Sequence, residues 1–534
     1  MQQVSFQDAV ALGKSAQQAG DLTRARAIYE QILAAAPEHP EVLHLLGLVE
    51  LQSGRPEQAR EWIERAIKGF GGAAHFHANL GLVLVQLEQW EQAIAAYERA
   101  LSLHADFPQA REALAGVYAK WGELLHDRGE IERAVEIYRS SLRLRAGDPE
   151  VLNNLGAGLL ELSRAEEAIE PLQQALSIKP DQGDAQVNLG TALRDLHRFD
   201  EAVRAFESAA ATHPGWYAPE SALGIVKLLR EDFAAGWKLL ERRWGEPSLA
   251  KIRGSYTQPQ WTGQPLNGRR ILLYGEQGLG DVIQFIRYVP MVIERGGRVI
   301  VACDPTLVGL LSANFPTIEA WVSPGAPMPA HEFQSSLMSL PMVFDTNLQT
   351  IPARVPYLRA DPQIAARWQE RLAGLSGTRK VGLAWAGRAN HLRDRSRSIP
   401  PALLEPLGGV NGISLISLQV GRRSNALGFQ ISDFTADLTD FQQTAGLIAQ
   451  LDLVITVDTS VAHLAGAMSK PVWVLIQFSP DWRWMLNRTD SPWYPTMRLF
   501  RQPSPGDWSS PVAAITDKLR QLRSGEDLAG VTQP

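Results

Sequence analysis

Small and apolar residues recur along the first 244 residues in a pattern that repeats every 34 residues. Glycines mark one point of each repeat, with a single longer step of 41 residues: Gly13, Gly47, Gly81, Gly122, Gly156, Gly190 and Gly224. A small residue follows twelve positions later: Ala25, Ala59, Ala93, Ala134, Ala168, Ala202 and Gly236. A large apolar residue follows after four more: Tyr29, Ile63, Tyr97, Tyr138, Leu172, Phe206 and Leu240. These spacings predict seven units, each a pair of helices.

The small residues and the prolines indicate how such units pack. A small residue lets the two helices of one unit approach closely, and the large apolar side chains fill the gap between neighbouring units. Pro37, Pro180 and Pro214 close units at a common position, because proline lacks an N–H and has a fixed φ. We therefore expect an α-solenoid, whose long concave groove generally binds a partner.

Asparagine recurs at one position of the predicted repeats. Asn79, Asn154 and Asn188 each precede the repeat glycine by two residues, although asparagine is a poor helix former. Its amide offers donors and an acceptor, so these residues are candidates to clamp the main chain of an extended peptide. A run of hydrogen bonds between repeats explains them equally well. The other repeats carry alanine, leucine or lysine there, so any ladder is partial.

The 34-residue period stops after Trp244, and short β-rich runs then alternate with helix-like segments. The runs are Ile271–Tyr274, Arg298–Cys303, Lys380–Trp385, Ile413–Leu418, Leu453–Val457 and Val472–Ile476. This alternation predicts parallel α/β sheets with right-handed crossovers. The weakly periodic stretch 323–362 is interpreted as the seam between two lobes. The predicted domains are a solenoid (1–244), a linker (245–268), a first lobe (269–360) and a second lobe (361–534).

The first β-rich run leads into a glycine-rich turn that carries a carboxylate. Gly275, Gly278 and Gly280 precede Asp281, which opens a predicted helix. The glycine order is not that of a dinucleotide-binding loop, and the Gly-Lys-Ser/Thr of a P-loop is absent. Glycine here lets a bulky substrate lie against the main chain. Asp281 is either a helix N-cap or a base that accepts a proton from a hydroxyl nucleophile.

A second junction follows the run that ends at Val457. Asp458, Thr459 and Ser460 start a predicted helix that continues to Met468. Free backbone N–H groups, the positive end of the helix dipole and two hydroxyls together form a pyrophosphate cradle, to which His463 can add a donor. The structural alternative is a capped helix in an ordinary α/β unit.

Between these junctions lies a local excess of positive charge. This segment contains one carboxylate, Asp394, and four arginines: Arg388, Arg393, Arg395 and Arg397. Arg422 and Arg423 repeat the arrangement after the next run. The carboxyl ends of parallel strands are where such sheets bind ligands, so we expect an anion here, although solvated loops also collect arginine.

Composition narrows the class of protein. The 534 residues are 45% hydrophobic and 21% charged, which is typical of several globular domains. A net charge of −6 argues against a nucleic-acid or anionic-membrane partner. The single cysteine, Cys303, excludes an intramolecular disulfide and favours a reducing compartment. We find no secretory signal, and charges interrupt the most apolar stretch, Leu451–Phe478, so we expect a cytoplasmic protein without a membrane span.

These patterns resemble two known families. The 34-residue helix pairs resemble the tetratricopeptide repeat over about Phe6 to Trp244, and the asparagines are similar to the ladder in the groove of O-GlcNAc transferases. The glycine loop with Asp281 resembles that of heptosyltransferase-type enzymes, and VDTSVAHLAGAMSKP resembles their donor-binding D-T-x-x-x-H segment. Together with RSRSIP and FSPDWRWM, the stretch Ile271–Leu522 looks like the glycosyltransferase domain that many bacterial proteins carry behind tetratricopeptide repeats, flagellin glycosyltransferases among them.

The resemblance implies two Rossmann-like lobes of GT-B type and a role for each matching residue. Asp281 becomes the candidate general base, and Gly278 and Gly280 belong to the acceptor-side loop. The donor-binding set comprises Arg397, Gln419, Arg422, Asp458, Thr459, Ser460 and His463. The stretch LQVGRRSN lacks the acidic residue that contacts the ribose in heptosyltransferases, which leaves the nucleotide open and makes Asp437 or Asp440 a substitute.

These features lead to one expected function and several alternatives. We expect transfer of a sugar from a nucleotide-diphosphate sugar, as co-substrate, to a Ser or Thr hydroxyl of a flagellin-like protein held in the repeat groove. No cofactor is expected, and no catalytic metal, because no clustered His/Asp set stands out. The alternatives are transfer to a lipid-linked or envelope glycan, and a scaffold without activity. Asp304, at the end of the second run, would suit the ribose-binding acid of a dehydrogenase. The glycine order argues against this function.

Overall fold

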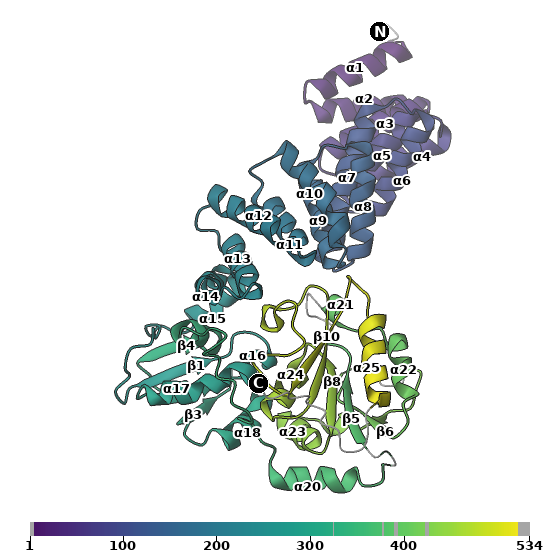
Figure 1. The fold of residues 1–534 in the computed structure, drawn as a ribbon. Helices are drawn as coiled ribbons and strands as arrows, with labels where there is room; N and C mark the ends of the chain where they lie inside the picture. Colours follow the sequence, from purple (N-terminus) through teal and green to yellow (C-terminus); the bar gives the residue numbers. More distant parts are fainter. Residues whose placement is uncertain are drawn as a thin grey trace. The chain divides into compact units, whose positions relative to one another are not determined.

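The computed structural model describes residues 5–323, 325–375, 377, 379–388, 394–421 and 427–521. The chain forms two compact units, residues 1–188 and 189–534, which we describe one at a time (Figure 1). Among the helices of the described ranges, none is both long enough and apolar enough to cross a bilayer.

The first unit is a stack of antiparallel helix pairs. Its helices are α1 (Phe6–Gln18), α2 (Leu22–Ala35), α3 (Pro40–Gln52), α4 (Pro56–Gly69), α5 (Ala74–Gln86), α6 (Trp90–Leu103), α7 (Pro108–Asp127), α8 (Ile131–Leu144), α9 (Pro149–Glu161) and α10 (Ala165–Ile178). Each odd-numbered helix packs against the even-numbered helix that follows it, as the 34-residue period predicts. The α-solenoid prediction is therefore confirmed.

The repeat glycines make room for the large apolar residue of their own repeat. A Cβ on Gly13 would lie 2.4 Å from the Tyr29 ring, and one on Gly81 would lie 2.6 Å from Tyr97. Tyr29 has no exposed surface, as expected for a ring pressed onto a helix backbone. The large residues thus pack within a repeat, on its glycine, whereas the sequence pattern was interpreted as filling the gap between repeats.

The step of 41 residues between Gly81 and Gly122 has a simple structural origin. Helix α7 has 20 residues and α5 has 13, and the extra turns precede Gly122. The extension carries Ala110 and Leu114 into the core, where they are 1% and 2% exposed. The repeat is lengthened at one helix without a break in the stack.

The second unit begins with the last helix pairs. Helix α11 (Gly183–Asp195) crosses the division between the units, and it is followed by α12 (Phe199–Thr212), α13 (Tyr217–Leu229), α14 (Phe233–Leu240), the short helix η1 (Glu241–Gly245) and α15 (Pro247–Gly254). Trp237 of α14 shares a core with the first sheet and donates its indole N–H to the carbonyl of Thr346 at 2.8 Å. The functional boundary at residues 244 and 245 stays a prediction.

The first sheet has four parallel strands in the order β3-β2-β1-β4. They are β1 (Arg270–Tyr274), β2 (Arg298–Ala302), β3 (Ala320–Val322) and β4 (Phe333–Ser336), and the helices around them are α16 (Leu279–Phe285), α17 (Val289–Glu294), α18 (Pro305–Asn314) and α19 (Leu340–Val343). Alternate residues of β1 enter different cores, since Leu273 faces α16 and Leu272 packs with Trp244.

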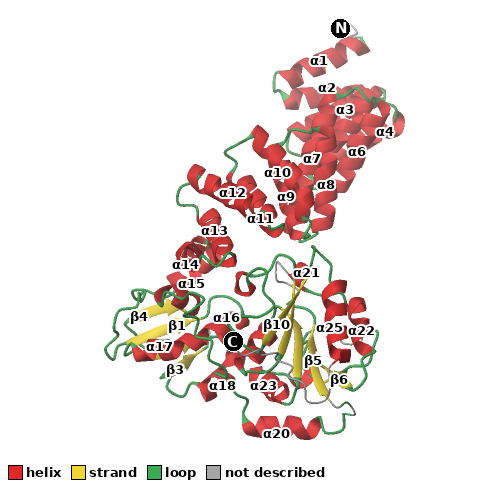
Figure 2. Ribbon diagram, viewed as in Figure 1, coloured by secondary structure: helices red, strands yellow, loops and turns green. Residues whose placement is uncertain are grey.

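The second sheet has six parallel strands in the order β10-β9-β8-β5-β6-β7. Figure 2 shows strands in yellow. The strands of this sheet are β5 (Arg379–Ala384), β6 (Ile413–Ser417), β7 (Ser432–Asp433), β8 (Leu453–Val457), β9 (Val472–Ile476) and β10 (Met497–Arg501). Its helices are α20 (Pro362–Arg371), α21 (Asp394–Arg397), α22 (Glu405–Gly408), α23 (Phe441–Ala449), α24 (Ser460–Ala467) and α25 (Ser509–Gln521). Two parallel sheets confirm the predicted fold class of a helical solenoid followed by α/β.

All six predicted β-rich runs are strands, but four strands were missed. One of them, β4, lies inside the stretch interpreted as a seam between lobes and pairs directly with β1. Its polar residues Gln334, Ser335 and Ser336 are buried, so β4 has no apolar alternation to reveal it. The seam interpretation is wrong for residues 333–336.

Candidate functional site

One cavity of about 960 Å³ collects the loops that follow the strands of both sheets. In each sheet the chain reverses the direction in which strands are added, between β1 and β4 and between β5 and β8. Parallel sheets bind ligands at the carboxyl edge beside such reversal points. The loops after β1, β5 and β8 all line the cavity, so the topology itself positions the site.

Asp281 lies in this cavity and is held by two partners. The helix that the sequence places at Asp281 begins at Leu279, with Gly278 as N-cap, so Asp281 is its third residue. The Gly278 N–H donates to its carboxylate at 2.7 Å, and Arg483 forms an ion pair with the other oxygen. The carboxylate is therefore fixed at the cavity wall, 18% exposed, beside a buried guanidinium.

The second predicted junction faces the same cavity. Thr459 is the N-cap of α24 and makes no side-chain cap hydrogen bond; its hydroxyl lies 3.1 Å from that of Thr456. Thr459, Ser460 and Asp458 all line the cavity. The first N–H groups of α24 thus meet the cavity without a capping side chain, which suits an anion.

Burial raises the pKa of the Asp458 carboxyl to about 6, and the neighbouring Asp481 carboxylate adds to the increase. Arg483 and Arg397 lower the same pKa and offset part of the effect. Asp458 is therefore a carboxyl group whose charge changes close to neutral pH, at the wall of a site rich in arginine.

His463 joins the two junctions. A Cβ on Gly280 would lie 2.7 Å from the His463 ring, so α16 and α24 touch at this point. The ring Nδ1 lies 3.0 Å from the Tyr494 hydroxyl, and the ring stacks on Trp484. Burial, followed by the charges of Arg483 and Arg287, holds the pKa of His463 well below its usual range, so the imidazole is neutral.

Arg397 reaches the cavity across a glycine. A Cβ on Gly387 would lie 2.3 Å from the Arg397 guanidinium, so a larger residue at position 387 requires this guanidinium to move. Its Nε is buried and has no hydrogen-bond partner among the described residues. Arg388 also lines the cavity and is exposed. The Arg397 Nε lies 3.7 Å from the Asp394 carboxylate. A guanidinium at the cavity wall suits a phosphate ligand.

Gln419 lines the cavity, but its carbonyl oxygen is already used. It accepts hydrogen bonds from the N–H groups of Trp385 and Ala386 at 3.0 and 2.8 Å, and so fixes the loop after β5. The predicted residues Arg393, Arg422 and Arg423 lie outside the described residues.

The two substitutes for the ribose carboxylate lie in different places. Asp440 lines the cavity, but it caps α23 by accepting from the Gln443 N–H at 2.9 Å. Asp437 pairs with Arg371 at 2.6 Å. Asp304, the residue on which a dehydrogenase would depend, is the N-cap of α18.

The sequence interpretation assigned no role to the residues after β9. Gln477, Asp481 and Arg483 line the cavity, and Arg483 donates to Gln284 at 2.7 Å besides pairing with Asp281 and Asp481. The segment FSPDWRWM pointed to this region only by resemblance. No sequence pattern marks Arg483, because its importance comes from burial and from contacts with residues far away along the chain.

The loop that carries these residues is fastened to the last helix pairs of the same unit. His197, between α11 and α12, lies 2.8 Å from the carbonyl of Phe478, and the two rings stack at 4.1 Å. Ser479 donates to Asp195 at 2.7 Å. Asp481 and Arg483 follow within four residues, so the last repeats hold the loop that lines the cavity.

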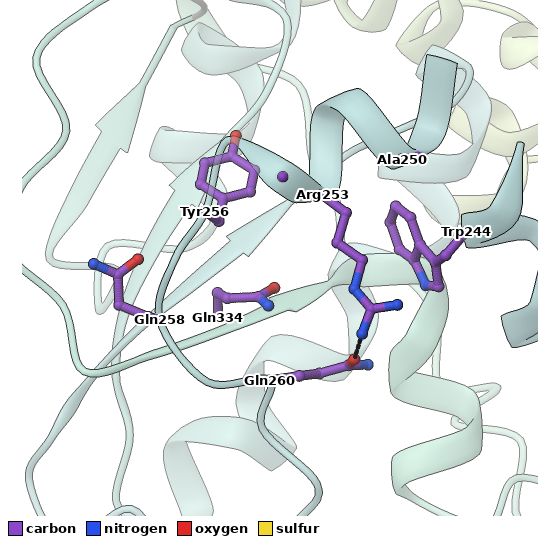
Figure 3. Close-up of a pocket in the computed structure, with 8 residues that line it drawn as sticks. Trp244, Ala250, Arg253, Tyr256, Gln258, Gln260 and Gln334 are labelled. Carbon is purple, nitrogen blue, oxygen red and sulfur yellow. Dashed lines mark hydrogen bonds between the residues drawn. The ribbon is translucent and has the colours of Figure 1, made fainter. Parts of the chain in front are cut away.

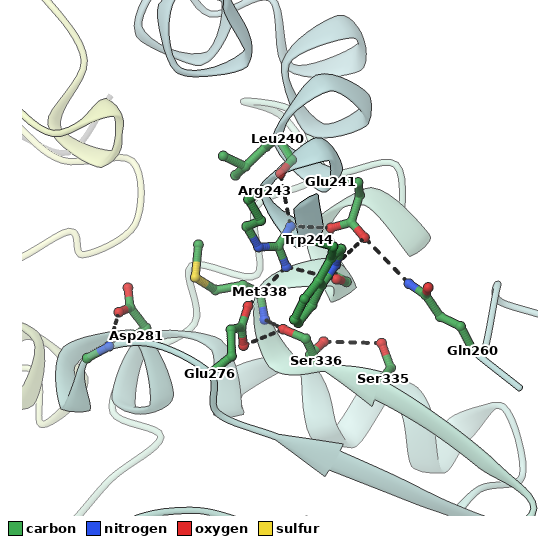
Figure 4. Close-up of polar contacts among 12 residues, drawn as sticks. Leu240, Glu241, Arg243, Trp244, Gln260, Glu276, Asp281, Ser335, Ser336 and Met338 are labelled. Carbon is green, nitrogen blue, oxygen red and sulfur yellow. Dashed lines mark hydrogen bonds and ion pairs between the residues drawn. The ribbon is translucent and has the colours of Figure 1, made fainter. Parts of the chain in front are cut away.

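Glu276, in the glycine loop, was also missed (Figure 4). It is 8% exposed, pairs with Arg243 of η1 at 3.0 Å and accepts a hydrogen bond from Ser336. Burial raises the pKa of Glu276, and Arg243 opposes the increase. Glu276 does not line the cavity; it ties the glycine loop to the end of the helical repeats.

The three asparagines of the first unit take part in hydrogen bonds. The Asn79 Nδ2 lies 2.8 Å from His44 Nε2, and Asn188 donates to Asn153 at 2.9 Å, in each case 35 residues back along the chain. Asn154 accepts weakly from Asn153 at 3.5 Å. Two of the three amides therefore bond to the preceding repeat, as the structural explanation of this pattern requires.

A second cavity of about 400 Å³ lies beside β4, between Gln334 and the segment that follows η1 (Figure 3). Trp244 and Tyr256 form its aromatic walls, and Arg253 donates to Gln260 at 3.0 Å. Gln334 points into it, and its Oε1 is buried without a hydrogen-bond partner. The two cavities share no lining residue.

Family comparisons match different parts of the chain. Tetratricopeptide repeat families match residues 10–74, 81–122, 119–184 and 159–222. Glycosyltransferase family 9 (heptosyltransferase) matches residues 435–484, which contain the α24 junction and Arg483 but not Asp281. The chain thus contains stretches that match tetratricopeptide repeats and, nearer its end, a stretch that matches the heptosyltransferase family.

Individual proteins and solved structures are also similar to this chain or to parts of it. Protein FlbA of Caulobacter vibrioides is 27% identical over 94% of this chain and 82% of its own length. The human cell division cycle protein 16 homolog is 30% identical over 25% of this chain and 22% of its own length. The solved structure of YrrB, a TPR protein with an unusual peptide-binding site, covers 36% of this chain and 98% of its own at 20% identity and a TM-score of 0.29.

Proposed function

We propose that this protein is a two-lobed glycosyltransferase of GT-B type that transfers a sugar from a nucleotide-diphosphate sugar to a Ser or Thr hydroxyl of a protein. The observation that supports this most is the shared cavity of about 960 Å³. Its lining includes the start of α24, which has no capping side chain, the arginines Arg388 and Arg397, and the fixed carboxylate of Asp281. One bound donor would reach the start of α24 and the Asp281 carboxylate.

The donor diphosphate would bind at the start of α24. The N–H groups of Ser460 and Val461 and the guanidinium of Arg397 would face its phosphates, and Arg388 would add charge at the rim. As the bond to the sugar breaks, negative charge builds up on the leaving diphosphate, and preorganised donors of this kind stabilise it. We propose that these groups suffice without a catalytic metal, so a chelator is expected to leave donor turnover unchanged.

Asp281 would accept the proton of the attacking hydroxyl. Its carboxylate has about four lone-pair positions, and Gly278 and Arg483 use only part of them. The loop of Gly278 and Gly280 would let the acceptor main chain approach. Arg483 would hold Asp281 in place and, through Asp481, set the position of the donor loop.

The acceptor would be a protein, such as a flagellin, bound by the repeats. This assignment keeps the functional solenoid at residues 1–244 and the lobes at 269–360 and 361–534. The amides of Asn79, Asn154 and Asn188 would still contact an extended peptide with the hydrogen-bonding capacity that the repeats leave free. Holding the acceptor beside the donor turns an encounter of two molecules into an oriented step.

A transfer assay tests the proposal. Purified full-length protein is incubated with a panel of nucleotide-diphosphate sugars and candidate acceptor proteins, and intact mass reports the addition of one sugar. Transfer to a lipid-linked glycan and to no protein would replace the proposed acceptor. Binding of a donor without any turnover would leave only a nucleotide-sugar-binding scaffold.

Asp281→Asn tests the catalytic assignment. General base catalysis contributes about 10²- to 10⁴-fold, so the turnover number is expected to fall at least about 100-fold while donor affinity changes little. Asp361→Asn is the matched control, because Asp361 caps α20 and does not line the cavity. Full activity of Asp281→Asn would show that another group takes the proton.

A further inference from the structure

Two histidines and a glutamate from adjacent repeats lie close together in the first unit. Glu41 and His44 belong to α3, and His75 belongs to α5. One ligand atom from each lies within 4.8 Å of the other two. Glu41 and His75 are 34 residues apart, the repeat length, so they occupy the same position on stacked helices. The period of the chain therefore brings them together.

His44 provides an independent observation. Its side chain is 3% exposed, yet its Nδ1 is buried without a hydrogen-bond partner among the described residues. An unsatisfied polar atom in a protein interior costs free energy unless a ligand or water meets it. A ring nitrogen can meet a donor or a metal ion, and the two other side chains nearby are also metal ligands by chemistry.

The other ring nitrogen of His44 is already oriented. Its Nε2 lies 2.8 Å from the Asn79 side-chain nitrogen. Metal-binding histidines typically use their second nitrogen to donate to a fixed acceptor, which sets the ring orientation. With Nδ1 on a metal, Nε2 carries the hydrogen and donates to the Asn79 oxygen, which requires only that the amide be turned over.

We propose that Glu41, His44 and His75 bind a divalent transition-metal ion of the zinc class and thereby join the second and third repeats. Two imidazole nitrogens and one carboxylate are a well-known set for such ions, with metal–ligand distances of about 2.0–2.2 Å. A fourth position is left for water or for a group of a bound partner. This site lies in the repeats, and it is independent of the proposed transfer reaction.

The ligands must move together to bind an ion, and their exposure permits it. The side chains of Glu41 and His75 are 40% and 53% exposed, so both can change rotamer, whereas the buried His44 stays fixed. Lys14 lies 3.2 Å from Glu41 and is itself 45% exposed. The metal ion would replace the Lys14 ammonium as the positive charge beside Glu41.

The test is a zinc titration of the full-length protein without a polyhistidine tag, followed by calorimetry. One ion per chain is expected to bind saturably. Glu41→Gln and His75→Ala change exposed side chains, and each is expected to weaken that binding at least about tenfold. Asn79→Ala, which removes the orienting amide, is expected to weaken it about 10- to 100-fold.

His104→Ala is the matched control, because His104 is an exposed histidine at the end of α6. The zinc affinity of the His104→Ala variant is expected to equal that of the unchanged protein. Zinc is expected to raise the melting temperature of both proteins. Unchanged zinc binding in His75→Ala and Glu41→Gln would overturn the proposal, as would equal weakening in His104→Ala. Absence of saturable binding would overturn it as well.

Discussion

The position of Arg397 depends on a residue that has no side chain. The guanidinium occupies the space where a Cβ on Gly387 would stand, 2.3 Å away. Glycine at position 387 therefore permits the present position of the Arg397 guanidinium, although ten residues separate them in sequence. No pattern of apolar or charged positions reveals such a pairing.

Gly387→Ala is expected to displace Arg397 and weaken the binding of a nucleotide-diphosphate sugar about tenfold or more, the worth of a charge-assisted hydrogen bond. Arg397→Ala is expected to have a similar effect, and the two changes together are expected to add little. Calorimetry measures the affinities. Gly374→Ala is the control, since a Cβ there meets nothing within 4 Å. Unchanged affinity in Gly387→Ala would remove Arg397 from the donor site.

The Asp458 carboxyl makes donor binding depend on pH. Its pKa is raised from 3.8 to about 6, so it is protonated in the folded protein below that pH. A bound diphosphate adds negative charge beside it and favours the protonated form further. Binding therefore takes up protons, and affinity is expected to fall as the pH rises from about 5.5 to about 7.5.

Calorimetry of a nucleotide-diphosphate sugar in two buffers of different ionisation enthalpy measures this proton uptake. Asp458→Asn carries no titrating group, so its affinity is expected to be nearly independent of pH over the same range. The same pH dependence in Asp458→Asn would assign the uptake to another group.

The candidate site shows which residues a sequence can predict. Thr459 and Ser460 closely follow a strand with a clear apolar run, and Asp281 follows another such strand after the glycine loop, so their place at a sheet edge could be inferred. Arg483 belongs to a loop without periodicity, and its importance comes from contacts with Asp281 and Gln284, about 200 residues away in sequence. Contacts of that range are set by packing and leave no local pattern.

At the scale of elements, helices beside the two sheets meet where α16 crosses α24. A Cβ on Gly280 would lie 2.7 Å from His463 and 3.5 Å from the Ser460 backbone. Gly280, which belongs to the proposed acceptor-side loop, also lets a second helix approach its main chain. The crossing sets the distance between the carboxylate loop and the start of α24.

Gly280→Ala is expected to push these helices apart. Overpacking of a tight contact costs about 1–3 kcal/mol, so the free energy of unfolding is expected to fall by that amount. Turnover is expected to fall more than donor affinity, because Asp281 moves away from the bound donor. Chemical denaturation and steady-state kinetics measure the two effects. A variant as stable and as active as the unchanged protein would mean that His463 moves aside freely.

The strands differ in how well the sequence predicts them. β8 and β9 are entirely buried and entirely apolar or β-branched, so their existence was evident. β4 is built from Phe333, Gln334, Ser335 and Ser336, and its polar side chains are buried by partners such as Glu276. Period-2 alternation cannot detect a strand whose inward residues are polar.

At the scale of the whole molecule, the division at residues 188 and 189 predicts which part acts alone. A protein that begins at residue 189 keeps α13 and α14, which share a core with the first sheet. It is expected to bind the nucleotide-diphosphate sugar with unchanged affinity and to lose transfer to a protein acceptor.

Calorimetry and intact mass measure these two properties. A protein that begins at residue 241 is a useful comparison, because it also lacks Trp237 and Leu240 of that core. Its lobes are expected to unfold. Protein transfer that survives the loss of residues 1–188 would mean that the acceptor is recognised by the lobes alone.

The seven extra residues of α7 amount to nearly two full turns of helix and about 10 Å of length. Seven residues fall only about 20° short of two complete rotations about the helix axis. An insertion of this size keeps the buried stripe in phase, which is why Ala110 and Leu114 still face inward. Five inserted residues would have turned that stripe toward water. Arrays of this kind can therefore gain length in steps of seven, and each step adds new surface while the neighbouring repeats keep their contacts.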